Sequence, residues 1–466
     1  MKPELGTEEH PLRVAVVGSG PAGFYVAEHL LKSDVHVEVD MFDRLPTPFG
    51  LVRFGVAPDH LKIKSVTRVF DRIAKNPAFR FYGNVEIGND IRLDDLRDLY
   101  HQICFATGAQ TDRQMGIPGE DLPRSHAATE FVAWYNGHPD YRDCEFDLSA
   151  ERVAVVGVGN VAVDVARILC RTPEELLETD IAEHALEALK NSRVREVYML
   201  GRRGPLQAAF TNPEARELGE LKGADIHVPA EEARLDPLSA AELDASEDDT
   251  LRKKVEIIQD FAEREPEGKP RRLTLRFLVS PIELFAGEDG GVRTMRIEKN
   301  ELVSDGERTS PRGTGRTEDL PVDLVFRSVG YRGVHIDGIP FHERWGVIPN
   351  EAGRVTDPDT AKPLPGMYVS GWIKRGPSGV IGTNKKDGTE TATAMLEDVA
   401  TSSVLAPTSP DPAAIDTLVR ARQPSLVTYE DWTRLDALEL ARGEVAGRPR
   451  VKFTSRVEIR EALAEA

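Results

Sequence analysis

The sequence predicts an α/β protein made of two Rossmann-like domains, with one domain inserted into the other. Three observations support this fold class. A Val-rich strand at 12–17 leads into a glycine-rich turn and an amphipathic helix, and the same succession recurs from residue 152. A further strand and glycine-rich loop follow at 367–383, ahead of a helix expected at 388–400. The chain has 466 residues, a length that suits two or three domains.

The first turn, 18–23 (GSGPAG), has the G-x-G-x-x-G spacing of dinucleotide-binding folds. Its first glycine permits a tight turn, the second lets the backbone approach a pyrophosphate, and the third lets the helix pack on the strand. The next strand, expected at 35–42, leads to Asp43, whose carboxylate suits a ribose 2′-hydroxyl and repels a 2′-phosphate. This first site is therefore expected to bind FAD or NAD. A chance glycine-rich turn is the alternative.

The second turn, 157–162 (GVGNVA), follows the strand at 152–157 and carries alanine at the third glycine position, which is a permitted variant. The strand expected at 194–200 leads to Arg202 and Arg203, where the first site has an acid. Guanidinium groups match a phosphate in charge and in bidentate geometry. The second site is therefore expected to bind NADP(H). The alternative is that the arginines are a solvated pair in a loop.

Two further strands, expected at 99–108 and 323–330, close the first half of the outer domain and the inserted domain. The prediction is a discontinuous FAD-binding domain with an NADP-binding domain inserted into it. The expected limits are 1–110 and 331–400 for the FAD-binding domain, 111–330 for the NADP-binding domain, and 401–466 for a C-terminal extension with a Pro/Ser linker and no assigned chemistry.

Composition excludes several classes of function. The net charge of −19 argues against nucleic acid as a partner. Three widely spaced cysteines, without a CxxC pair or a cluster, provide neither a redox dithiol nor an iron–sulfur site, and no metal site is expected. No apolar run is long enough to span a bilayer, and the polar amino terminus lacks the features of a targeting peptide. The cytoplasm is the expected location.

Longer blocks of the sequence resemble the adrenodoxin reductase family, the NADPH:ferredoxin reductases of mitochondria and bacteria. The blocks are 18–23, LPTPFGLVR at 45–53, GVAPDH at 55–60, IPGEDLP at 117–123, GRRGP at 201–205 and GWIKRGP at 371–377. The resemblance covers about residues 10–400 and is greatest to bacterial members. It implies hydride transfer from NADPH to FAD, followed by single-electron transfer to an iron–sulfur ferredoxin. Asp43 departs from the glutamate that family members often carry.

The resemblance also implies site residues. It makes His60 and Glu214 the catalytic polar residues beside the flavin and nicotinamide, and Trp372 and Gly379 the residues that shape the nicotinamide pocket. The residues expected to bind the two cofactors are Gly18, Gly20, Pro21, Ala22, Gly23, Asp43, Arg44, Gly50, Leu51, Gly108, Gly157, Gly159, Asn160, Val161, Arg202, Arg203, Glu214, Gly371, Trp372, Gly379, Val380 and Ile381.

Without the resemblance, the sequence also allows purely structural roles for these residues. Asp59 would cap a helix, with His60 in its exposed first turn. Glu214 would be a solvated helix charge and Trp372 a core residue. Asp164 and Arg167 are expected to be surface charges on a helix.

Charge is unevenly distributed along the chain. Residues 53–75 carry six basic and two acidic side chains, whereas residues 225–250 carry nine acidic and one basic. An acidic ferredoxin is therefore expected to dock on a basic face. The expected face comprises Arg53, Lys62, Lys64, Arg68, Arg72 and Lys75, extended by Lys374, Arg375, Lys385 and Lys386.

Three rival functions are considered. A relative of the glutamate synthase small subunit would normally carry a cysteine-rich amino-terminal region, which this sequence lacks. A flavin monooxygenase would share the glycine turns but not the block at 55–60. A redox sensor that binds dinucleotides without catalysis is the non-enzymatic alternative.

Overall fold

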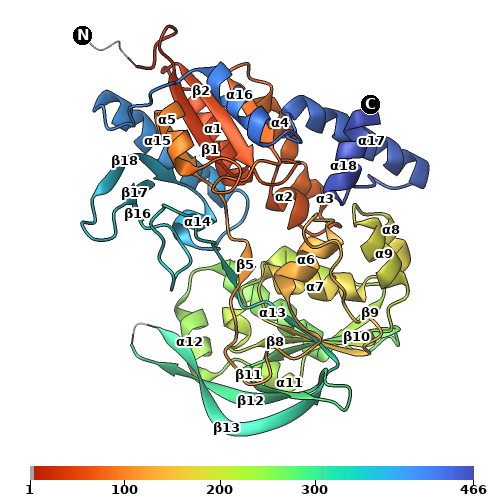
Figure 1. The fold of residues 1–466 in the computed structure, drawn as a ribbon. Helices are drawn as coiled ribbons and strands as arrows, with labels where there is room; N and C mark the ends of the chain where they lie inside the picture. Colours follow the sequence, from red (N-terminus) through yellow and green to blue (C-terminus); the bar gives the residue numbers. More distant parts are fainter. Residues whose placement is uncertain (1–4, 307, 466) are drawn as a thin grey trace.

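The computed structural model describes residues 5–306 and 308–465, which form two α/β domains, one above the other in Figure 1. The first domain contains a seven-stranded sheet in the order β16-β17-β18-β4-β1-β2-β3. The strands from β18 to β3 run parallel, and β16 and β17 extend the sheet antiparallel. Their bounds are β1 Leu12–Val17, β2 Val37–Asp43, β3 Phe79–Gly83, β4 Gln102–Phe105, β16 Asn350–Glu351, β17 Arg354–Thr356 and β18 Pro363–Val369.

The second domain contains a six-stranded parallel sheet in the order β6-β14-β7-β8-β10-β9. All of its strands come from the part of the chain between β4 and β18, so this domain is inserted into the first, as predicted. The bounds are β6 Ser125–Ala127, β7 Arg152–Val156, β8 Glu196–Gly201, β9 Ala224–His227, β10 Arg271–Phe277 and β14 Leu324–Arg327.

The two passages between the domains lie side by side. The outgoing strand β5 (Thr111–Asp112) pairs antiparallel with the returning strand β15 (Tyr331–Arg332). The amide of Gln110 adds a hydrogen bond of 3.0 Å to the carbonyl of Arg332. A two-stranded ribbon therefore joins the domains. The exact residues at which each domain begins and ends stay predictions.

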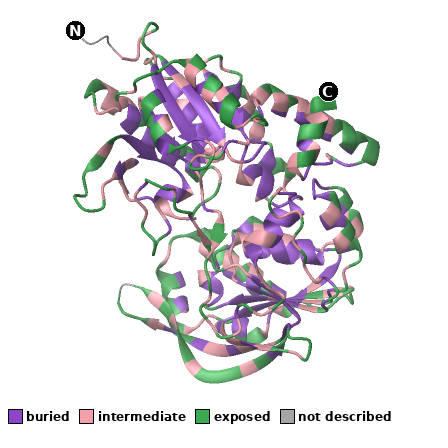
Figure 2. Ribbon diagram, viewed as in Figure 1, coloured by how far each residue is buried: buried purple, intermediate pink, exposed green. Residues whose placement is uncertain are grey.

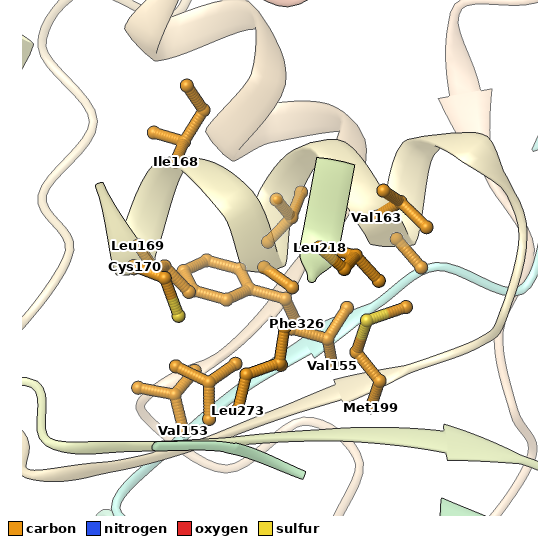
Figure 3. Packing of buried hydrophobic residues seen from close by; sticks show 14 of the residues in the cluster. Val153, Val155, Val163, Ile168, Leu169, Cys170, Met199, Leu218, Leu273 and Phe326 are labelled. Carbon is orange, nitrogen blue, oxygen red and sulfur yellow. The ribbon is translucent and has the colours of Figure 1, made fainter. Parts of the chain in front are cut away.

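Each sheet is covered on both faces, which is why its central strands, such as β1 and β7, are apolar along most of their length. On the second sheet, α6, α7, α9, α10 and α13 cover one face and bury a core that includes Val155, Met199, Leu273 and Phe326 (Figure 3). The other face packs on an antiparallel sheet of β11, β12 and β13, whose outer strand stays exposed (Figure 2). The bounds are β11 Val279–Ala286, β12 Val292–Ser304 and β13 Thr309–Pro321.

In the first domain, helix α1 packs closely against helix α15. Gly388 of α15 therefore has no room for a side chain beside Tyr25 of α1. Helix α15 begins at Thr383, earlier than the predicted residue 388. The bounds are α1 Pro21–Leu31, α2 Leu51–Phe54, α3 Leu61–Lys64, α4 Thr67–Ala74, α5 Leu93–Leu99, α14 Trp372–Arg375 and α15 Thr383–Ala400. Those of the second domain are α6 Ala128–Tyr135, α7 Asn160–Cys170, α8 Pro173–Leu177, α9 Glu183–Lys190, α10 Asn212–Leu218, α11 Ala230–Ala233, α12 Pro237–Ala245 and α13 Asp249–Glu263.

The C-terminal extension forms α16 (Pro412–Arg422), α17 (Tyr429–Ala446) and α18 (Arg456–Glu465), which lie against the first domain and reach the second (Figure 1). Buried Lys452, just before α18, contacts Asp180 of the second domain at 3.2 Å. The same carboxylate contacts Lys64 of the first domain at 2.7 Å. The extension therefore ties the two domains together. Within the described residues, no helix combines the length and apolar character needed to cross a bilayer.

Candidate active site

A cavity of about 1040 Å³ lies where the two domains meet. The first glycine turn, the start of α7 and the loop after β18 all contribute to its walls. The structure therefore brings together residues that are up to several hundred positions apart in the chain. The predicted site residues that line the cavity are Gly18, Gly20, Pro21, Ala22, Asp43, Arg44, Gly50, Leu51, His60, Gly108, Asn160, Val161, Glu214, Trp372, Gly379, Val380 and Ile381.

The two glycine turns have the same geometry. Gly18 and Gly157 have φ angles of +109° and +137°, and a Cβ atom on either would lie within 2.4 Å of a carbonyl oxygen on the neighbouring strand end. Gly20 and Gly159, in contrast, have no atom within 4 Å of a Cβ position. A phosphate group can therefore approach the backbone at both second glycines. This free space fits a dinucleotide at each turn.

Asp43 has a structural partner in addition to its predicted ligand. Its Oδ2 accepts hydrogen bonds from the amide and hydroxyl of Ser19, at 2.9 and 2.5 Å, and its Oδ1 accepts one from the amide of Leu45. The carboxylate therefore holds the first glycine turn in place. Contact with a ribose hydroxyl at this position stays a prediction.

The loop after β18 forms the opposite wall. Trp372 is half-buried on the cavity rather than in the core, and its Nε1 donates to the carbonyl of Ser378 at 3.1 Å. Its ring lies 5.4 Å from that of Tyr331 on the interdomain ribbon. Gly371 is not part of the cavity lining, and a side chain there would meet Ala22. Val380, which is 57% exposed, marks the mouth of the cavity.

The residue that His60 contacts is Glu217, which was not among the predicted site residues. The Nε2 of His60 lies 2.9 Å from Oε2 of Glu217, one turn beyond Glu214 on α10. Glu214 lines the cavity, but its carboxylate accepts hydrogen bonds from the amide and hydroxyl of Thr211 and so caps α10. The T-x-x-E spacing at 211–214 is the signal that indicates this capping box. A catalytic role for Glu214 stays a prediction.

Asp164 and Arg167 on α7 were predicted to be surface charges, and this prediction is wrong. Arg167 is fully buried and contacts Asp59 and Asp164 at 2.7 Å and Glu217 at 3.1 Å. Arg171 contacts Asp59 at 2.7 Å, so Asp59 pairs across the domain interface instead of capping a helix. Residues three or four apart share a helix face, and this face of α7 points at the first domain.

These contacts shift the pKa values at the cavity wall. Burial lowers the pKa of His60, but the hydrogen bond to Glu217 and the nearby carboxylates of Asp164 and Asp59 together outweigh it and raise the pKa above its ordinary value. Burial raises the pKa of Asp164 to about 6, against the attraction of Arg167. Two groups that can change protonation near neutral pH therefore lie beside the cavity.

Gly157, Gly159 and the two arginines lie outside the cavity walls, along the carboxyl ends of β7 and β8. Arg202 is exposed and Arg203 half-exposed. Among the residues that the structure describes, neither guanidinium has a hydrogen-bond or ion-pair partner. Unpaired cations beside the second glycine turn fit a phosphate.

The predicted basic face is smaller than expected, because several of its cations are buried in ion pairs. Arg53 pairs with Glu439 at 2.5 Å, Lys64 with Asp180, and Lys374 with Asp387 at 2.8 Å. Arg375 also faces inward, toward Asp387. The cations that remain exposed are Lys62, Arg68, Arg72, Lys75, Lys385 and Lys386.

Comparison with known proteins agrees with the geometry. A family model described as pyridine nucleotide-disulphide oxidoreductase matches residues 12–218. The NADPH-ferredoxin reductase FprA of Mycobacterium tuberculosis (strain ATCC 25618 / H37Rv) is 46% identical over 459 residues, covering 96% of this chain and 98% of that protein. The mitochondrial NADPH:adrenodoxin oxidoreductase of Mus musculus is 42% identical over 475 residues, covering 99% of this chain and 93% of that protein.

The similarity extends to the three-dimensional fold. The structure of Mycobacterium tuberculosis FprA in complex with NADPH has a TM-score of 0.91 and 44% identity to this chain, covering 98% of this chain and all of that one. Identity at this level over nearly the whole length shows common ancestry in both domains and in the extension. The chain belongs to the adrenodoxin reductase family.

Proposed function

We propose that this chain is an NADPH:ferredoxin oxidoreductase with FAD as its flavin. The observation that carries the proposal is a cavity whose walls include the first glycine turn, the start of α7 and His60, which Glu217 contacts. Bound FAD would supply the chemistry that accepts a hydride from NADPH and releases electrons singly to an iron–sulfur protein. The relatives' names describe the same activity.

The chain's own residues would then bind the two cofactors, orient them and shield them from water. The first glycine turn and the loop at 371–383 would hold FAD, and the second turn with Arg202 and Arg203 would hold NADP(H). Trp372 covers the wall where a nicotinamide would lie and restricts access of water. Protonated His60, held by Glu217, places a positive charge beside the cavity, where it would offset negative charge gained on reduction.

The His60–Glu217 contact predicts a pH dependence. Because Glu217 raises the pKa of His60, the imidazole stays protonated to a higher pH than an ordinary histidine. Flavin reduction by NADPH should slow as pH rises through that pKa. In Glu217→Gln the decline should move to lower pH, since only Asp164 and Asp59 then oppose the effects of burial and Arg167 on this pKa. Stopped-flow reduction rates between pH 5.5 and 9 measure the shift.

Two variants control this prediction. Glu220→Gln, an exposed carboxylate just beyond α10, should leave the profile unchanged. His60→Ala should abolish the pH-dependent decline while FAD stays bound. A Glu217→Gln profile identical to the parent's would show that this pair does not set the protonation that matters.

The partner is proposed to be an acidic ferredoxin that docks beside α3 and α4. Ile63 lines the cavity and is 46% exposed, next to exposed Lys62, and Arg68 and Arg72 follow on α4. An apolar contact surrounded by cations suits an acidic protein. Long-range attraction of this kind raises association rates and weakens with salt.

Reversing Lys62, Arg68 and Arg72 to glutamate tests this docking face. Ferredoxin reduction at low salt should fall by about tenfold or more, and its salt dependence should flatten. Reduction of ferricyanide by NADPH should hardly change. The matched control reverses Lys190, Arg193 and Lys222, which are exposed near the amino ends of β8 and β9. If only the control set impairs ferredoxin reduction, docking lies on the NADP domain instead.

The proposal as a whole is tested by anaerobic turnover with NADPH and a purified acidic ferredoxin. Fast NADPH-dependent reduction of ferricyanide would exclude a redox sensor without catalysis. Ferredoxin reduced at a comparable rate would distinguish this enzyme from a flavoprotein that serves a fixed partner subunit. The cytoplasm stays the predicted location.

A further inference from the structure

The loop that carries Arg202 and Arg203 is held from outside the Rossmann sheet. Asn300, which is 8% exposed in β12, donates from Nδ2 to the carbonyl oxygen of Arg202 at 2.8 Å. The amide of Leu278 donates to the carbonyl of Arg203 at 3.1 Å. Both arginine carbonyls are thus bound by the segments that form the antiparallel sheet, although the guanidinium groups are unpaired among the described residues.

Asn300 also fixes the second of these contacts. Its own amide donates to the carbonyl of Leu278 at 2.7 Å. Leu278 is the single residue between β10 and β11, and its φ of +54° is unusual for a residue with a side chain. Asn300 therefore reaches the arginine loop twice, through its side chain and through the backbone of Leu278.

At position 300 the side chain contributes through hydrogen bonds of its amide group rather than through apolar packing. Asn300 lies at an irregularity in the pairing of β12 with β13, where the register shifts between Glu298 and Asn300. The same Nδ2 that donates to Arg202 also donates to Oγ of Ser280 at 2.8 Å. An apolar side chain would fill the space but would leave the part-buried carbonyl of Arg202 without this donor, and the loss of a hydrogen-bond partner weakens the hold on the loop.

We infer that Asn300 is a positioning residue for NADP specificity, which acts by orienting the backbone beneath Arg202 and Arg203. The inference rests on the proposed binding of the 2′-phosphate by these arginines. Two flexible side chains bind a phosphate well only when their backbone is fixed, because ordering it on binding costs entropy. Because Asn300 and Leu278 already fix this backbone in the folded protein, it does not have to be ordered when the phosphate binds.

The test compares ligands that differ only in the 2′-phosphate. Isothermal titration of the FAD-loaded protein with 2′,5′-ADP and with 5′-AMP should show that Asn300→Ala weakens binding of 2′,5′-ADP by about five- to tenfold. Binding of 5′-AMP should not change. In steady state the KM for NADPH should rise while kcat stays near the parent value.

Matched variants distinguish an effect on the orientation of the Arg202–Arg203 backbone from a general loss of structure. Ser280→Ala removes the other partner of the same Nδ2 and should bind both ligands like the parent. Leu278→Gly keeps the amide donor in a conformation that glycine tolerates, and should also resemble the parent. Asn300→Asp cannot donate and should lose selectivity as Asn300→Ala does. Equal weakening of both ligands in the Asn300 variants would overturn the inference.

A double-mutant cycle distinguishes this inference from the proposed function. If Arg202→Ala/Arg203→Ala leaves the preference for 2′,5′-ADP intact, the phosphate site itself is misplaced. If that pair abolishes the preference but Asn300→Ala does not alter it, only the inference about Asn300 fails. If Asn300 acts through the arginines, its replacement should have no further effect in the double-alanine background.

Discussion

Replacing Arg202 and Arg203 together with alanine should raise the KM for NADPH by about two to four orders of magnitude, because charge-assisted contacts contribute about 1.5–3 kcal/mol each. The KM for NADH should change little, since NADH lacks the 2′-phosphate. The basis is their position beside the second glycine turn and the absence, among the described residues, of any side-chain partner that would compete for them. Initial rates of ferricyanide reduction with each nucleotide measure both constants.

Arg193→Ala/Arg195→Ala is the matched control. This pair is also exposed but lies before the amino end of β8, at the opposite edge of the sheet from the glycine turn. Both KM values should stay at the parent level in that variant. An equal rise in the KM values for NADPH and NADH in the Arg202/Arg203 variant would contradict this prediction. It would show that the arginines maintain the conformation of the loop and do not bind the 2′-phosphate.

Glu439→Gln should lower the free energy of unfolding by about 3–5 kcal/mol, the usual cost of breaking a buried ion pair. Glu439 is fully buried in α17 and contacts Arg53 at 2.5 Å and Arg450 at 2.9 Å. Burial raises the pKa of Glu439, but the two arginines outweigh it and hold the pKa below its ordinary value. The contribution is therefore present above about pH 4.5 and is lost as pH falls through the lowered pKa.

The same substitution should loosen FAD. Arg53 lies on α2, whose neighbours Leu51, Val52 and Phe54 line the cavity. Urea unfolding followed by flavin fluorescence measures stability and release together. Glu444→Gln, an exposed residue of the same helix, should match the parent in both readouts. A Glu439→Gln protein as stable as Glu444→Gln would show that the extension contributes little through this contact.

Local features could be predicted from the sequence because they depend on neighbouring residues. Strand β1 and the positions of both glycine turns follow from short apolar runs next to glycines, and the strand was found at the expected residues. The expected strands at 99–108 and 323–330 are shorter, at Gln102–Phe105 and Leu324–Arg327. Apolar composition marks a buried segment but does not mark where its ladder of hydrogen bonds ends.

The charged residues of the site could not be placed in this way. The partner of His60 is Glu217, 157 positions away, and the partner of Lys64 is Asp180, 116 positions away. A charge on a helix is normally solvated, and only the packing of one domain on another buries Arg167 or Lys64. The role of the extension was missed for the same reason, because the contacts of Glu439 with Arg53 and of Lys452 with Asp180 form only when the extension packs on the two domains.

The most direct test of the proposed function is a double-mixing stopped-flow experiment under anaerobic conditions. The FAD-loaded protein is mixed first with one equivalent of NADPH and then with an oxidised acidic ferredoxin, while flavin and iron–sulfur absorbance are followed together. The account predicts loss of flavin absorbance in the first step, its return in the second as the ferredoxin is reduced, and a slower first step in His60→Ala. Flavin that stays oxidised with NADPH, or reduced flavin that ferredoxin does not reoxidise, would contradict it.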